Sequence, residues 1–163
     1  MDSPAQALQL LQHDSLFRDW NKQRKADLTH FFCSLDAQAQ LLSPWEIGFV
    51  EHQKITVFTF FQDKVIIKPA DDIFKREEDV VEKLDFAKAT VSWEEARTKC
   101  LRELPTLYPT ENRGNGFCIL QSWKGTIVWN FTFITKSIKF LNLKLNAGTG
   151  TVHEHQLLNL TEK

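Results

Sequence analysis

The chain has 163 residues, of which 42% are hydrophobic and 25% are charged, and its 20 basic and 21 acidic side chains leave a net charge of −1. This composition excludes an intrinsically disordered chain and predicts a substantial core, in one domain or two small fused subdomains. Nucleic-acid binding is disfavoured, because it normally requires a concentrated basic surface. The first residues lack a secretory signal, and no apolar run approaches the roughly 20 residues that span a bilayer. We therefore expect a cytoplasmic protein that does not enter a membrane.

The first half predicts a helix followed by an antiparallel sheet. Ser3 and Pro4 form a helix cap with proline at the first helical position, and the apolar spacing extends to Trp20 through a break near residues 13–15. Residues 36–44 are expected to form a loop or a short helical turn. Strands are expected at 28–35, 45–50, 55–61 and 65–67, the last one ending at Pro69. The short turns between the last three favour antiparallel neighbours.

A charged connector, residues 76–90, separates this half from a second one. Ser92 and Glu95 form a capping box that predicts the start of a helix, and a mostly apolar stripe runs from Trp93 to Leu104 at helical spacing. We expect Pro105 and Pro109 to close this segment. Four further strands are expected, at 117–123, 127–135, 139–147 and 152–160.

The two halves resemble each other in their order of elements and in the spacing of key residues. Cys33 and Cys118 are separated by 118 − 33 = 85 positions, and Trp45 and Trp129 by 129 − 45 = 84. The predicted fold is therefore α+β, with two related units at 1–75 and 91–163, each an N-terminal helix plus an antiparallel β-meander. If the units are copies, these pairs should occupy equivalent positions.

Residues 90–160 resemble the PepSY domain. The resemblance is carried by Ser92-Trp93-Glu94-Glu95-Ala96 at the start of a helix, by Tyr108-Pro109 after it, and by the closing turn Asn146-Ala147-Gly148-Thr149-Gly150-Thr151-Val152. The first half is interpreted as a degenerate copy. The resemblance implies a helix packed on a small antiparallel sheet and a non-enzymatic binding or inhibitory role, in which the partner could be a peptidase.

No residue set in the sequence indicates catalysis. No serine or cysteine lies in a nucleophile motif, and Cys33, Cys100 and Cys118 suit buried reduced thiols better than disulfides or a zinc site. His153 and His155 are two apart on a predicted strand and so are expected to share a face, but a third metal ligand is missing nearby. We expect no enzyme activity, no metal and no cofactor.

The alternation in residues 127–135 places Trp129, Phe131 and Phe133 on the core face of the sheet and leaves a semi-polar face on the other side. We predict that this second face, or an edge strand, binds a protein or peptide. The candidate binding residues are Trp123, Val128, Asn130, Thr132, Asn142 and Lys144. The alternative is a small-ligand pocket between helix and sheet, lined by phenylalanines, and a third interpretation is a homodimer formed by edge strands or sheet faces.

Overall fold

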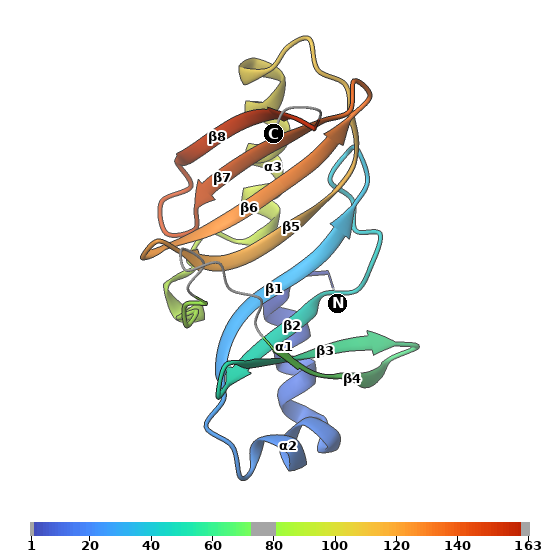
Figure 1. Ribbon diagram of the computed structural model, residues 1–163, viewed down its shortest axis with the longest axis vertical. Helices are drawn as coiled ribbons and strands as arrows, with labels where there is room; N and C mark the ends of the chain where they lie inside the picture. The colour runs from blue at the N-terminus through green and yellow to red at the C-terminus, as the bar shows by residue number, and fades with distance from the viewer. Residues whose placement is uncertain (1, 73–80, 161–163) are drawn as a thin grey trace.

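The computed structural model describes residues 2–72 and 81–160, with backbone only for 69–72, and shows an α+β protein with one antiparallel sheet (Figure 1). The helices in these residues are α1 (Pro4–His13), α2 (Ser15–Asn21) and α3 (Trp93–Leu107), with a 3-10 turn η1 (Phe86–Lys88) before α3. The strands are β1 (Asp27–Leu35), β2 (Glu46–Glu51), β3 (Lys54–Phe61), β4 (Lys64–Asp72), β5 (Arg113–Trp123), β6 (Thr126–Thr135), β7 (Lys139–Asn146) and β8 (Val152–Asn159).

The eight strands form a single sheet in the order β4-β3-β2-β1-β5-β6-β7-β8. Each half supplies a meander of four strands, and the two meanders join where β1 pairs with β5 in antiparallel fashion, with Cys33 directly opposite Cys118. In Figure 1 the three helices lie behind the sheet, and no described helix covers its front. We call this front the helix-free face.

The core lies between the helices and the sheet. Trp45, Trp93 and Trp129 meet there, with ring centroids 5.1 Å apart for Trp45 and Trp93 and 5.7 Å apart for Trp93 and Trp129. All three are at most 4% exposed. A second aromatic group packs α2 onto the first meander, where the Phe17 ring lies 5.1 Å from that of Phe58. The buried faces predicted by strand alternation are confirmed for Trp129, Phe131 and Phe133.

Side-chain caps define the starts of the helices as the sequence predicts. The Ser3 hydroxyl accepts a hydrogen bond from the Gln6 backbone N–H at 3.3 Å, and the Ser92 hydroxyl accepts one from the Glu95 N–H at 3.1 Å. The break near residue 14 is real, because the Asp14 carboxylate caps the start of α2. The helix ends between the two prolines that the sequence predicts to close it: α3 continues past Pro105 to Leu107, and the Tyr108 N–H closes its last turn on the Leu104 carbonyl. A proline there removes one N–H, which the last turn tolerates.

Two strand boundaries differ from the prediction by more than one residue. β4 continues past Pro69 to Asp72. It is an edge strand, and its pairing with β3 shifts register between Ile55 and Val57. A proline, which lacks a backbone N–H, is tolerated at such a position. β5 begins at Arg113 rather than 117, and its Gly116 lies against the backbone of β6. The expected connector at 76–90 lies partly outside the described residues. Its described part contains Leu84, whose N–H bonds to the Leu28 carbonyl at 2.7 Å.

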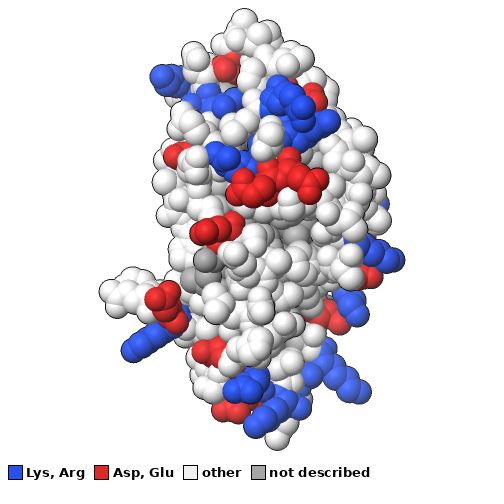
Figure 2. Space-filling view, turned by 180° about the vertical axis from the view of Figure 1, so that it is seen from behind, with Lys and Arg blue, Asp and Glu red and all other residues white. Residues whose placement is uncertain are grey.

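The helix-covered side carries charges of both signs. Figure 2, turned by 180° from Figure 1, shows acidic and basic side chains gathered over the α3 half, while the surface over α1 is white. This agrees with the sequence of α1, which contains no Lys, Arg, Asp or Glu. None of the described helices is long and apolar enough to cross a membrane.

Candidate functional site

The six residues predicted as a binding surface lie together on or beside the helix-free face. Their strands are neighbours, since β5 pairs with β6 and β6 with β7, and the pairing sets Asn130 opposite Lys144 and Thr132 opposite Asn142. The prediction that this face is open is only partly right. Val128, Asn142 and Lys144 are at most 7% exposed, because the side chains on these three strands pack against one another. The candidate site is therefore a polar surface whose side chains are largely buried against one another.

Asn142 is the centre of a hydrogen-bond network on this face. Its Nδ2 donates to Asn130 Oδ1 at 2.7 Å, to Thr132 Oγ1 at 3.0 Å and to the Phe131 carbonyl at 3.0 Å. Its Oδ1 accepts from Lys144 Nζ at 2.8 Å. Because each link fixes the rotamer of the next side chain, the network holds Lys144 in one place.

Trp123, at the end of β5, is flanked by two ammonium groups and a histidine. Lys144 Nζ lies 4.7 Å from the indole centroid and Lys124 Nζ lies 4.5 Å from it, both within cation–π range. The His153 ring meets the indole edge-on with centroids 5.9 Å apart. Desolvation lowers the pKa of Lys144, and the nearby positive charge of Lys124 lowers it further, against the opposing effect of Glu154. We call Trp123, Lys124 and Lys144 the indole–lysine cluster.

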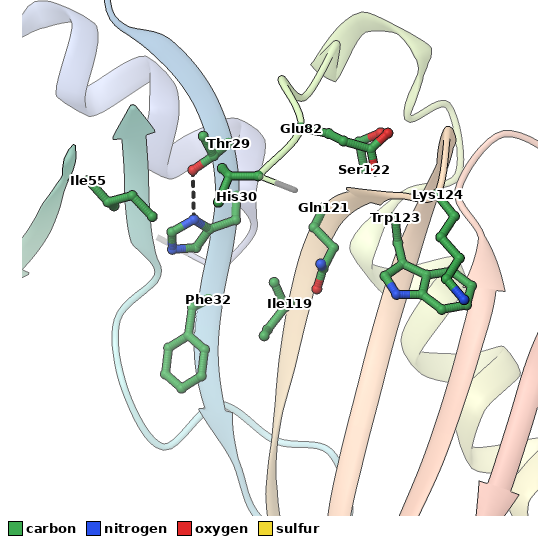
Figure 3. Close-up of a pocket in the computed structure, with 11 residues that line it drawn as sticks. Thr29, His30, Phe32, Ile55, Glu82, Ile119, Gln121, Ser122, Trp123 and Lys124 are labelled. Carbon is green, nitrogen blue, oxygen red and sulfur yellow. Dashed lines mark hydrogen bonds between the residues drawn. The ribbon is translucent and has the colours of Figure 1, made fainter. Parts of the chain in front are cut away.

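A cavity of about 870 Å³ opens beside this cluster, between β1 and the β5–β6 hairpin. Figure 3 shows His30 and Phe32 on its β1 side and Gln121, Trp123 and Lys124 on its β5 side. Glu82 of the connector also lines it, and its carboxylate accepts a hydrogen bond from the Gly125 N–H at 2.9 Å. Cavity and network meet at Gln121, whose Oε1 lies 3.5 Å from Asn130 Nδ2.

His30 reaches the cavity because its neighbour on β2 is a glycine. A Cβ at Gly48 would overlap the His30 imidazole in this orientation, so a larger residue there would force the ring to move. The Thr29 hydroxyl donates to the Gly48 carbonyl at 3.2 Å and lies 2.8 Å from His30 Nδ1. A hydroxyl has one hydrogen, so in the neutral ring Nδ1 is the donor to Thr29 and Nε2 remains an acceptor. Sequence analysis missed His30, and its pairing with Gly48 is visible only in the sheet register.

Burial gives His30 a predictable effect on stability. Desolvation lowers the pKa of His30, and the charge of Glu46 opposes this only in part. The unfolded chain therefore binds more protons at this site as the pH falls through and below about 6.5, the ordinary imidazole value, so folding stability decreases there. In urea unfolding at neutral and mildly acidic pH, we expect the wild type to lose more stability than His30→Gln. Equal losses in His30→Gln and the wild type would contradict the expectation.

His153 and His155, which the sequence predicts to share a face, meet different partners. His153 contacts Trp123 edge-on, whereas His155 Nδ1 lies 2.9 Å from the Tyr108 hydroxyl at the end of α3. The alternative prediction placed a phenylalanine-lined pocket between helix and sheet. Among the described residues, the buried aromatic side chains there are packed as core, and the cavity beside Trp123 lies on the other face.

The cysteines are buried and free, as expected for structural thiols. Burial raises the pKa of Cys100 to about 12 and raises those of Cys33 and Cys118 as well, which keeps all three protonated and unreactive. Within residues 2–72 and 81–160, no group of three or more His, Cys, Asp or Glu side chains is placed to hold a metal ion.

No protein-family model matches the chain, and no curated protein matches it. Among solved structures, it is similar to a protein described as a "putative lipoprotein (CD1622) from Clostridium difficile 630". The TM-score is 0.61 and the identity is 14%, and the match covers 95% of this chain and 92% of that chain. At this identity the likeness shows a shared fold and nothing further about the site.

Proposed function

We propose that the protein is a non-enzymatic binding module that recognises a protein or peptide segment on the helix-free face of its sheet. One observation carries the proposal: the cavity beside β1 and the ordered polar network of β6 and β7 meet at Gln121 and Trp123, on a face that no described helix covers. Together they form a surface with both apolar contacts and fixed hydrogen-bonding groups, which is what recognition of a peptide requires.

The chemistry of the surface favours binding over catalysis. The polar network consists of amides, a threonine and a lysine, and the cysteines are protonated and buried on the other side of the sheet. The cavity adds the Thr29 hydroxyl, 2.8 Å from His30 Nδ1, but this hydroxyl donates its hydrogen to the Gly48 carbonyl, so the imidazole does not activate it as a nucleophile. The resemblance to PepSY makes a peptidase one candidate partner. A cytoplasmic location stays a prediction.

We further propose that the chain consists of two related units, with the binding surface at their junction. The symmetric strand order, the pairing of Cys33 with Cys118, and the proximity of Trp45 to Trp129, whose centroids are 6.4 Å apart, support this. The cavity takes residues from β1 of the first unit and β5 of the second, so neither unit would form it alone.

Selection of peptides from a phage-displayed random library against the full chain tests the binding function. We expect enriched peptides whose binding is lost with Trp123→Ala, because this indole borders both the cavity and the network. Phe61→Ala is the matched control, since Phe61 is an aromatic residue at the β3–β4 hairpin and is 62% exposed. Failure to enrich any peptide, or equal loss in both variants, would overturn the proposal.

A small-molecule ligand is the second candidate, because about 870 Å³ is within the ordinary range of ligand sites. Native mass spectrometry of the purified protein separates the two candidates. A stoichiometric small molecule that is released by Trp123→Ala, together with no enriched peptide, would favour this alternative.

A further inference from the structure

We propose that the bound segment presents a carboxylate group, which is held by the indole–lysine cluster of Trp123, Lys124 and Lys144. This inference rests on the proposed function and names the chemistry that the surface selects. Its starting point is Lys144, which is only 6% exposed although it carries an ammonium group. Burial of a charge is costly unless other groups replace the water that it loses.

The described residues satisfy only part of the hydrogen-bonding capacity of the Lys144 ammonium group. The ammonium of Lys144 has three N–H donors, and among residues 2–72 and 81–160 it makes one hydrogen bond, to Asn142 Oδ1. It forms no ion pair within 4.0 Å with a described carboxylate. The indole of Trp123 adds a cation–π contact. Two donors therefore remain for a ligand at a site whose geometry the Asn142 network has already fixed.

The ammonium group of Lys124 also contacts the Trp123 ring. Lys124 is exposed in the β5–β6 turn, and its ammonium lies 4.5 Å from the Trp123 centroid. The positive charge of Lys124 acts on Lys144, so an anion that contacts both ammonium groups would relieve their repulsion while it gains two charge-assisted contacts. Gln121, which lines the cavity next to Trp123, offers an amide as a further polar contact.

The surroundings favour a singly charged carboxylate over a phosphate group. Glu82 lines the cavity, and Glu154 lies close enough to Lys144 to affect it electrostatically. Two carboxylates near two ammonium groups leave little net positive charge, so a second negative charge on the ligand would gain little attraction while it adds to the cost of desolvating the ligand. Phe32 and Ile119 on the adjacent cavity wall supply apolar contacts. The preferred segment therefore contains an acidic side chain, or a terminal carboxylate, next to apolar residues.

The test uses peptides selected on the full chain and measures their dissociation constants by fluorescence polarisation. We expect the selected peptides to share an Asp, a Glu or a free C-terminus near apolar residues. Replacing that group by its amide should weaken binding about tenfold or more, the usual scale for hydrogen bonds to a charged group. Lys144→Met and Lys124→Gln should each weaken binding of the acidic peptide and reduce the difference in affinity between this peptide and its amide form.

Lys136→Gln is the matched control, because Lys136 is an exposed lysine in the β6–β7 turn and its substitution makes the same change in net charge. Circular dichroism and thermal unfolding check that Lys144→Met is folded, and the exposed Lys124 supplies an independent variant if it is not. Peptides that bind the helix-free face but tolerate both the amide and the lysine substitutions would overturn the carboxylate assignment and leave the binding function standing. Absence of any selected peptide would instead count against the binding function.

Titration with acetate and inorganic phosphate distinguishes the two anions directly. The indole N–H signal of Trp123 in a proton–nitrogen correlation spectrum is assigned through Trp123→Phe. We expect acetate to shift this signal, and Lys124→Gln to diminish the response. A response to phosphate alone would assign the cluster to phosphate groups and overturn the carboxylate proposal.

Discussion

Trp129→Ala is expected to lower the free energy of unfolding by about 3–5 kcal/mol, as is typical when a large aromatic side chain is removed from a core. Trp129 is 2% exposed and packs against Trp93, with ring centroids 5.7 Å apart. Its indole N–H also donates to the Val91 carbonyl at 3.1 Å, which ties the segment before α3 to β6. The truncation would create a cavity between α3 and the sheet. Urea unfolding followed by circular dichroism measures the change.

Phenylalanine variants separate the contribution of the hydrogen bond from that of packing. Trp129→Phe leaves the Val91 carbonyl without its indole donor, whereas Trp45→Phe removes an N–H that has no hydrogen-bond partner among the described residues. We therefore expect Trp129→Phe to lower the free energy of unfolding by about 1 kcal/mol more than Trp45→Phe does. A loss below about 1 kcal/mol for Trp129→Ala would contradict the burial of this residue.

Gly116→Ala is expected to destabilise the protein by about 3 kcal/mol, at the upper end of the usual range for overpacking. A Cβ at this position would overlap the Thr132 carbonyl oxygen and approach the Phe133 Cα to 2.8 Å. Both are backbone atoms of β6, so relief requires movement of a strand. Because β5 joins the two meanders, that movement would disturb the centre of the sheet. Thermal and urea unfolding measure the loss.

Gly148→Ala is the control for this substitution. A Cβ there would lie 3.3 Å from Asn146 Oδ1, the end of a side chain, in an exposed turn. We expect a change within about 0.5 kcal/mol, as at an ordinary surface position. Equal effects at both positions would show that the loss of glycine itself, rather than the contact with β6, determines the cost.

The polar network includes a buried lysine, which carries a cost in stability. Lys144 is kept near Trp123 by a hydrogen bond from its ammonium to Asn142, although desolvation lowers its pKa. A hydrophobic residue of similar volume would avoid that cost. Lys144→Met is therefore informative for stability as well as for binding, since a stable variant with weaker peptide binding separates the two roles.

Much of the local structure was predictable because it depends on neighbours in the chain. The caps at Ser3 and Ser92 and the alternation around Trp129 follow from hydrogen bonds and side-chain periods that a short segment determines. The same alternation selected residues of the candidate site, from Asn130 to Lys144, and the structure places them in one network. Their role in binding remains a prediction.

The end of β4 was not predictable from local preference. Proline normally ends a strand, but an edge strand does not require every ladder donor, so β4 continues past Pro69 to Asp72. The position of this strand within the sheet decided the case.

The sequence by itself determined the α+β class, the two runs of antiparallel strands and the residues on each strand face, because these depend on short-range patterns. Only the tertiary structure decided that β1 pairs with β5, that His30 lies over Gly48, and that the cavity opens beside Trp123. Those features join residues far apart in the chain. Their formation depends on the register and packing of the whole sheet, which no local pattern encodes.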